Sequence, residues 1–303
     1  MKHLRSMEDL SKIEIEQILD LAKEFKYETR HHIRHTKRLD GKALGMIFSK
    51  SSSRTRVSFE TGMFQLGGHA LFLSSKETQL GRGESIKDSA RVFGRYLDGI
   101  MIRTFQQSDI DELIEYAGIP IINGLTDYCH PCQVLADLQT ILEYKGKFDG
   151  LKMCYIGDGN NMANSLIVGG LKMGMEVACA TAPGYEPCSH IIDFGKSFGN
   201  KFMLTHDCLE AAKGADAIFT DVWASMGQED EKGIREKAFK GFCIDDALMS
   251  VTNKGCIVQH CLPAHKGEEI SEKVFEEHAT EIFDEAENRL HAQKAVLYLT
   301  MHD

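Results

Sequence analysis

Hydroxyl and guanidinium side chains are concentrated in one short segment of this 303-residue chain. The segment 52–56 has the sequence SSRTR, follows the apolar run 43–48 and precedes a stretch with helical periodicity. A helix N-terminus offers unpaired N–H groups and a positive dipole end, and arginine adds a planar fork that fits phosphate oxygens. The segment therefore predicts a phosphate-binding loop. The alternative is a well-capped helix with solvated arginines.

Composition narrows the ligands that such a loop would take. The formal net charge is −10 and the pI is near 5.7, which argues against a general nucleic-acid surface. No apolar run reaches the length of a membrane span, and the N-terminal residues lack an apolar signal core. Nine cysteines in a chain of this size indicate reduced thiols and a cytoplasmic location. A small anion is the expected ligand, although the loop is not a P-loop, because the G-x-x-x-x-G-K pattern is absent.

The elements that position this loop are predicted from the alternation of apolar strands and amphipathic helices. Expected strands lie within 43–48, 69–73, 99–103 and 119–124, and then within 151–156, 175–181, 201–205, 216–223 and 256–263. Helical segments separate them, starting with one that Ser11 and Glu14 begin as a capping box. This β-α-β order is typical of parallel sheets.

The fold class expected is α/β, with two open parallel-sheet domains joined by a long helix and an active site in the interdomain cleft. The predicted domains are 1–130, a linking helix within 131–150, and 151–284. The linking helix begins at Pro131, a favoured first-turn residue, and runs to about Tyr144 with an apolar stripe. A last helix, about 285–300, is expected to pack back on the first domain.

Three polar residues lie where ligands of open sheets usually bind. Arg103 and Asp221 each end a predicted strand, and His130 lies at the positive end of the linking helix. Taken alone, each has a structural explanation, namely a salt-bridged arginine, a helix N-cap and a helix-capping histidine.

The motif GDGNN, 157–161, predicts a dinucleotide site only weakly. Gly157 and Gly159 follow a strand, but Met162 stands at the third glycine position. No convincing acidic ribose ligand follows the next strand, so NAD binding is poorly supported.

The motif HCLPAH, 260–265, offers His260, Cys261 and His265 as possible zinc ligands. Cysteine and histidine are adjacent in this motif, which itself contains no C-x-x-C or H-x-x-x-H pattern, so no metal site is predicted.

The segment 52–56 resembles the carbamoyl-phosphate loop of the aspartate/ornithine carbamoyltransferase family, whose core is S-T-R-T-R. Ser53 stands where the family usually has threonine or glycine, which keeps a small side chain and a hydroxyl. The segments 79–105, 130–140, 157–161, 221–229, 260–263 and 285–289 are similar to the family in the same order. The resemblance covers essentially the whole chain.

The resemblance implies transfer of the carbamoyl group from carbamoyl phosphate to the δ-amine of L-ornithine, giving L-citrulline and phosphate. It implies that carbamoyl phosphate is bound by Ser52, Ser53, Arg54, Thr55, Gln79, Arg103, His130, Gln133, Cys261, Leu262 and Arg289. It implies that ornithine is bound by Asn161, Asp221, Ser225 and Met226, and that Arg103, His130, Asp221 and Cys261 are catalytic. No cofactor is implied.

Within this scheme Arg103 contacts the phosphate and the carbonyl oxygen, His130 polarises the carbonyl, and Gln133 binds the carbamoyl NH₂. Asn161 binds the α-carboxylate and Asp221 the α-ammonium of ornithine. The family also implies a homotrimer in which the Gln79 loop reaches a neighbouring active site.

Several alternatives stay open from the sequence. The acceptor amine could belong to putrescine or aspartate, although the segment SMG, 225–227, favours ornithine. Cys261 either receives the amine proton, orients the amine, or is an inert buried thiol. A nucleotide-binding protein built on GDGNN and a non-catalytic binding protein of the same fold are the remaining alternatives. Whether the role is biosynthetic or arginine-degrading is not specified by these residues.

Overall fold

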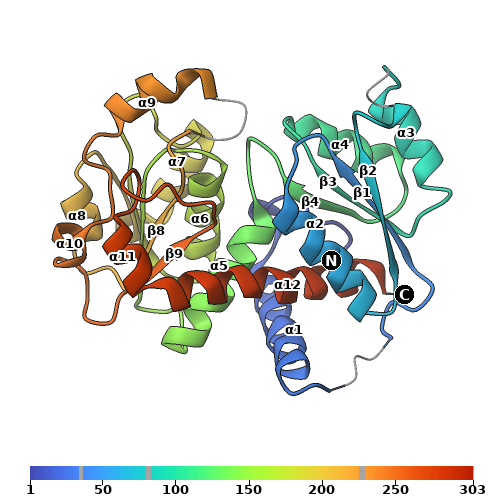
Figure 1. Ribbon diagram of the computed structural model, residues 1–303, viewed down its shortest axis with the longest axis horizontal. Helices are drawn as coiled ribbons and strands as arrows, with labels where there is room; N and C mark the ends of the chain where they lie inside the picture. Colours follow the sequence, from blue (N-terminus) through green and yellow to red (C-terminus); the bar gives the residue numbers. More distant parts are fainter. Residues whose placement is uncertain (34–36, 80–82, 225–228, 303) are drawn as a thin grey trace. The chain divides into compact units, whose positions relative to one another are not determined.

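The computed structural model describes residues 1–33, 37–79, 83–224 and 229–302. The chain divides into two compact units, drawn in Figure 1. Unit 1 comprises Met1–Ala136 and the residues from Asn288 onward, and unit 2 comprises Asp137–Glu287.

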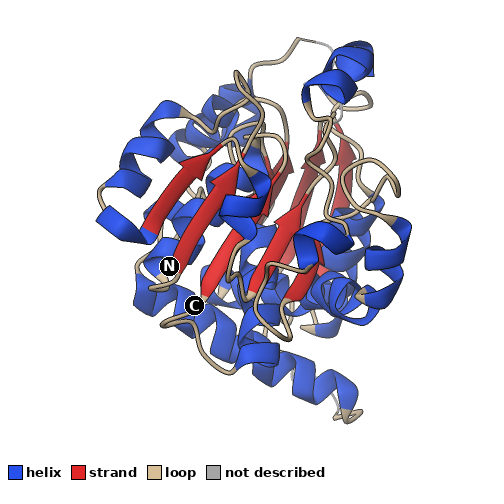
Figure 2. Cartoon of the chain, turned by 90° about the vertical axis from the view of Figure 1, so that its left-hand side faces the viewer, coloured by secondary structure: helices blue, strands red, loops and turns tan. Residues whose placement is uncertain are grey.

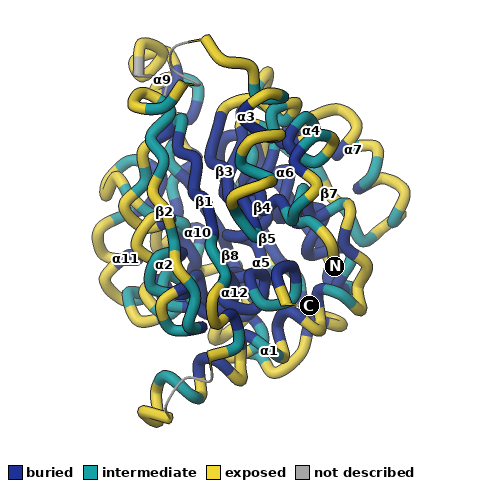
Figure 3. Tube along the Cα trace, turned by 90° about the vertical axis from the view of Figure 1, so that its right-hand side faces the viewer, coloured by how far each residue is buried: buried dark blue, intermediate teal, exposed yellow. Residues whose placement is uncertain are grey.

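Unit 1 is built on a four-stranded parallel sheet with the order β2-β1-β3-β4. The strands are β1 (Ala43–Phe48), β2 (His69–Ser74), β3 (Gly99–Arg103) and β4 (Ile121–Leu125). β1 and β3 pair in register from Leu44 opposite Gly99 to Phe48 opposite Arg103. β3 and β4 are buried along their whole length, whereas the edge strand β2 is half-buried or exposed (Figure 3).

The helices of unit 1 follow the predicted alternation. They are η1 (Met7–Asp9), α1 (Lys12–Arg30), α2 (Ser53–Gln65), α3 (Ile86–Phe93) and α4 (Gln107–Tyr116). The predicted capping box of α1 is confirmed, because the Ser11 side chain accepts from the Glu14 N–H while the Glu14 carboxylate accepts from the Ser11 N–H. The apolar face of this helix is buried, with Phe25 fully inaccessible.

Unit 2 is built on a five-stranded parallel sheet with the order β7-β6-β5-β8-β9. The strands are β5 (Lys152–Ile156), β6 (Glu176–Ala180), β7 (Phe202–Thr205), β8 (Ala217–Thr220) and β9 (Ile257–His260). Figure 2 shows the strands of a sheet as parallel arrows with helices on both faces. The remaining elements are α6 (Asn161–Lys172), α7 (Ser189–Lys196), η3 (Gly199–Lys201), α8 (Cys208–Ala212), η4 (Glu229–Glu231), α9 (Lys232–Ala238), α10 (Asp246–Met249) and α11 (Glu272–Glu277).

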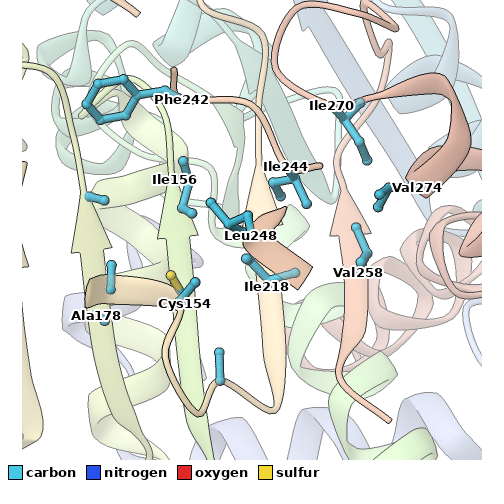
Figure 4. Close-up of a cluster of buried hydrophobic side chains, with 14 of the residues drawn as sticks. Cys154, Ile156, Ala178, Ile218, Phe242, Ile244, Leu248, Val258, Ile270 and Val274 are labelled. Carbon is cyan, nitrogen blue, oxygen red and sulfur yellow. The ribbon is translucent and has the colours of Figure 1, made fainter. Parts of the chain in front are cut away.

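The core on one side of the second sheet combines branched aliphatic residues with small ones (Figure 4). Ile156, Ile218 and Val258 project from three adjacent strands, and Ile244 and Leu248 pack over them. Such residues bury apolar area worth about 25 cal/mol per Å², which stabilises the sheet that carries the polar loops.

Two helices contain residues of both units. α5 (Pro131–Lys145) begins at the predicted proline, but residues 131–141 are all buried, so the predicted single stripe understates its burial. α12 (Ala279–Met301) begins six residues before the expected 285, because 279–284 continue the same helix. Within the described residues, no helix has the length and apolar character needed to cross a membrane.

Candidate active site

The SSRTR segment forms the N-terminus of α2. Ser52 is the N-cap in an extended conformation, and its Oγ accepts the N–H of Thr55 at 3.2 Å. Arg54 is exposed in the first turn, whereas Thr55 is fully buried. The local prediction of a capped helix with an arginine beside its positive end is confirmed, and this geometry suits an anion.

Arg103 lies beside this helix start because of the sheet order. The chain runs from β1 to β2 on one side of β1 and then crosses to β3 on the other side. Ligands of open sheets bind at such a switch point. Phe48, at the end of β1, pairs with Arg103, at the end of β3. Arg103 is buried, with 7% of its surface exposed.

Arg289, from α12, connects the loop to α5. Its Nη2 donates to Thr55 Oγ1 at 3.1 Å, and its Nη1 donates to Gln133 Oε1 at 2.9 Å. Ser52 Oγ also donates to Thr55 Oγ1, at 3.1 Å. Thr55 Oγ1 thus accepts two bonds, which leaves its own hydrogen for donation to a ligand.

His130 is surrounded by cations. Burial and the charges of Arg289, Arg103 and Arg54 hold the pKa of the His130 imidazole well below its usual range. The ring is therefore neutral at physiological pH and donates one N–H without adding charge. A neutral donor among three arginines suits a ligand with a polarisable carbonyl and a multiply charged anion.

The second polar cluster lies at the carboxyl ends of three adjacent strands of unit 2. The loop after β5 carries Asn160, Asp221 follows β8, and Cys261 follows β9. Asn160 Nδ2 donates to Asp221 Oδ2 at 2.9 Å, and Cys261 Sγ donates to Asp221 Oδ1 at 3.0 Å. The N–H of Val222 also donates to Asp221 Oδ1, at 2.8 Å. This network orients a buried carboxylate.

At the start of α6, the capping residue is Asn160 rather than Asn161. Asn160 caps α6, because its Oδ1 accepts from the N–H groups of Met162 and Ala163. Asn161, the residue predicted for ornithine, is the first residue of α6 and is half-buried. Sequence reasoning missed Asn160, because N-cap preference at a strand–loop–helix junction indicates an asparagine without deciding between the two adjacent ones.

Cys261 is half-buried and keeps its proton. Burial and the negative charges of Asp221, Glu285 and Asp137 raise the pKa of the thiol well above its usual range. A thiol held in this form donates to Asp221 and offers its sulfur lone pairs to an incoming N–H. It is not a ready base at physiological pH.

The two ring nitrogens of His260 are used within the fold. The Leu262 N–H donates to Nδ1 at 2.9 Å, so Nε2 carries the hydrogen and donates to Glu269 Oε1 at 3.0 Å. This pairing fixes the turn after Cys261, where Leu262 has a φ of +57°. His265, Glu268 and Glu269 have ligand atoms within 4.8 Å of one another, but Glu269 already accepts from His260.

The GDGNN glycines have a packing role. A Cβ at Gly159 would lie 2.3–2.4 Å from backbone atoms of Tyr185, Glu186 and Pro187. The Gly159 N–H donates to the Tyr185 carbonyl at 2.8 Å. The chain itself therefore fills the space beside Gly159 that a pyrophosphate would need in a dinucleotide site.

The other predicted site residues belong to different units of the chain. Gln79 is exposed, and its carbonyl accepts from the Glu84 N–H. Leu262 and Cys261 belong to unit 2, and the other residues predicted for carbamoyl phosphate belong to unit 1. Ser225 and Met226 lie outside the described residues.

Comparison with known proteins identifies the two units. Residues 2–143 match the family model described as "Aspartate/ornithine carbamoyltransferase, carbamoyl-P binding domain". Residues 149–300 match the model described as "Aspartate/ornithine carbamoyltransferase, Asp/Orn binding domain".

Curated relatives and solved structures agree with the family models. An ornithine carbamoyltransferase of Carboxydothermus hydrogenoformans is 53% identical over 300 residues, covering 98% of this chain and 96% of that protein. The structure of an ornithine carbamoyltransferase from Pyrococcus furiosus superposes with a TM-score of 0.93 at 48% identity, covering 99% of this chain and 97% of that one. An anabolic ornithine carbamoyltransferase of Campylobacter jejuni gives a TM-score of 0.92 at 43% identity, with 99% of both chains covered. These matches confirm the resemblance read from the motifs, and the chain belongs to the aspartate/ornithine carbamoyltransferase family.

Proposed function

We propose that this chain transfers the carbamoyl group of carbamoyl phosphate to the δ-amine of L-ornithine, giving L-citrulline and phosphate. The observation that carries the proposal is the gathering of Arg54, Arg103 and Arg289 around a neutral His130. Carbamoyl phosphate needs both functions, because it carries a phosphate dianion and a carbonyl that must be polarised.

Unit 1 holds the donor in this proposal. The N–H groups at the start of α2, with Arg54 and Arg103, bind the phosphate, which is also the leaving group. His130 and the Thr55 hydroxyl donate to the carbonyl oxygen, where charge develops in the tetrahedral intermediate. Gln133, whose Oε1 accepts from Arg289, binds the carbamoyl NH₂.

Unit 2 holds the acceptor. Asp221 pairs with the α-ammonium, and Asn161 binds the α-carboxylate. The neutral δ-amine attacks the carbonyl carbon, the new C–N bond forms, the C–O bond to phosphate breaks, and one amine proton leaves with solvent or phosphate. Cys261 accepts an amine N–H at sulfur and so orients the nucleophile, while its own S–H donates to Asp221.

A colorimetric assay for the ureido group of the product, with ornithine, putrescine, N-acetylornithine and aspartate side by side, tests the reaction and the acceptor. Ornithine should give the largest kcat/KM, because Asp221 can pair with its α-ammonium. Aspartate as the best acceptor would contradict the ornithine proposal within the same family. Absence of product with all four would contradict the enzymatic proposal itself.

We also propose a homotrimer in which Gln79 reaches a neighbouring active site. Support comes from apolar side chains that stay exposed on α2 and the edge strand β2, namely Phe64 at 81%, Leu71 at 40% and Phe72 at 36%. Light scattering measures the mass. Mixing inactive Gln79 and His130 variants should restore activity only if active sites are shared.

A cytoplasmic location is the remaining proposal. All nine cysteines are free thiols, as a reducing compartment would maintain. Fractionation of the source cells would test it.

A further inference from the structure

Arg235 is a buried cation that the proposed reaction does not use. It lies on α9, and its side chain is only 8% exposed. Its Nη1 donates to Asp158 Oδ2 at 2.8 Å and to the Trp223 carbonyl at 3.0 Å. Its Nε donates to Glu231 at 2.9 Å, and the guanidinium lies over the Tyr185 ring, 5.1 Å from the centroid.

The two partners of Nη1 belong to the two loops that carry the acceptor residues. Asp158 is two residues before Asn160, in the loop between β5 and α6. Trp223 is two residues after Asp221, in the segment that follows β8. One guanidinium nitrogen therefore joins these loops on one side, and the bond from Asn160 to Asp221 joins them on the other.

We propose that Arg235 is a positioning residue, which holds the loops after β5 and β8 at the separation that lets Asn161 and Asp221 bind the two ends of one amino acid. The proposal rests on the proposed function. A single α-amino acid spans a fixed distance between its ammonium and carboxylate, so a small change in loop separation weakens binding of the acceptor and leaves donor binding intact.

The ionisation of Asp158 supports this arrangement. Burial raises the pKa of the Asp158 carboxyl to about 6, against the opposing charge of Arg235. Without the guanidinium, burial would raise the pKa of the Asp158 carboxyl further and favour its neutral form. The connection that Arg235 makes between the two loops would then be lost.

A purely structural ion pair is the competing explanation, and it predicts a loss of stability without selective loss of ornithine binding. Three variants separate the two explanations: Arg235→Met, Asp158→Asn, and the double variant Arg235→Met/Asp158→Asn. Lys232→Met, on the same helix with an exposed side chain, is the matched control.

Steady-state kinetics should give Arg235→Met an ornithine KM raised roughly 10- to 100-fold, with the KM for carbamoyl phosphate within about twofold of wild type. The double variant removes the stranded buried carboxylate, so its Tm should recover toward wild type while the ornithine KM stays raised. Lys232→Met should match wild type in both. Calorimetry with L-norvaline, which keeps the α-ammonium and α-carboxylate, should show the same loss of affinity without turnover.

Two outcomes would overturn the proposal. One is an Arg235→Met enzyme that is active with an unchanged ornithine KM. The other is a double variant that recovers Tm and ornithine KM together, which would leave Arg235 a stabilising ion pair. If the wild type itself forms no citrulline, the proposed function fails, and the Arg235 proposal fails with it. If Arg235→Met does not fold, the double variant carries the measurement.

Discussion

The two units use the same sheet topology to build sites of opposite charge. In unit 1, β1 lies between β2 and β3, and in unit 2, β5 lies between β6 and β8. Polar site residues follow β1 and β3 in unit 1, and β5 and β8 in unit 2. Unit 1 gathers arginines around His130, whereas unit 2 gathers carboxylates around Cys261. In both, burial and neighbouring charges drive the central group to its uncharged form.

This difference explains how one chain can bind two substrates of unlike charge. An imidazolium at His130 would be repelled by the neighbouring arginines, and a thiolate at Cys261 would be repelled by the neighbouring carboxylates. Each central group is therefore neutral, and the net charge of each cluster is left to pair with a substrate of opposite charge. Breaking the charge pattern of one unit should therefore affect one substrate far more than the other.

Replacing Arg103 in unit 1 should have the largest effect. Arg103→Met removes a buried cation expected on both phosphate and carbonyl oxygen, so kcat/KM for carbamoyl phosphate should fall roughly a thousandfold or more. Steady-state citrulline formation measures it. Arg91→Met, with an exposed arginine on α3, is the control and should stay near wild type. A loss below tenfold would remove Arg103 from the reaction.

Replacing Asp221 in unit 2 comes next. Asp221→Asn keeps an oxygen for the bonds from Cys261 and Val222 but loses the negative charge. The kcat/KM for ornithine should fall about 30- to 1000-fold, the equivalent of roughly 2–4 kcal/mol. Putrescine turnover should fall much less, because it has no α-carboxylate to strand. Asp193→Asn, an exposed aspartate on α7, is the control. Equal losses for both acceptors would leave Asp221 a structural residue.

The fold was largely predictable because each strand is short, apolar and bounded by turn residues. Every predicted strand overlaps an observed one, whereas the register that places Phe48 opposite Arg103 is known only from the structure. Burial around α5 was not predictable, since polar residues such as Gln133 and Thr140 interrupt its stripe and become buried only through tertiary packing.

The site was predictable where a motif carries it and not where tertiary packing does. The capped arginine segment was identified because capping and charge are local properties. Asn160 and Asn161 differ by one position, and only the folded helix start shows which one caps it. Arg235 lies in a charged stretch, KGIREK, that is typical of an exposed helix, and its burial depends on residues 77 positions away.

The neutral state of His130 should appear as a pH dependence of stability. The folded pKa lies below the unfolded value near 6.5, so below that pH the unfolded chain binds a proton that the folded chain does not. Stability should therefore fall as pH drops below about 6.5, by up to about 1.4 kcal/mol per pH unit from this group. Urea unfolding followed by circular dichroism from pH 5 to 8 measures it.

His130→Gln provides the comparison. Its stability should decline less steeply than wild type below pH 6.5, and the difference between the two proteins should be constant above pH 7. If the plots of unfolding free energy against pH were parallel for the two proteins, His130 would have the same pKa in the folded and unfolded states. The neutral centre proposed for unit 1 would then be wrong.

The smallest expected effect concerns the thiol of unit 2. Burial and then Asp221 raise the pKa of Cys261, so removing the Asp221 charge should lower that pKa and increase the thiolate fraction. Alkylation by iodoacetamide, followed by mass spectrometry of the Cys261 peptide, should be a few-fold faster at pH 8 in Asp221→Asn than in wild type. The exposed Cys188 serves as an internal reference in each sample.

A profile of the alkylation rate from pH 7 to 11 separates the effect of charge from that of access. The midpoint of the profile reports the pKa of Cys261, and its plateau reports how easily the reagent reaches the sulfur. A lower midpoint with an unchanged plateau is the expected result. An unchanged midpoint would show that burial, and not the charge of Asp221, holds the proton on Cys261, and the charge pattern of unit 2 would then not explain the neutral thiol.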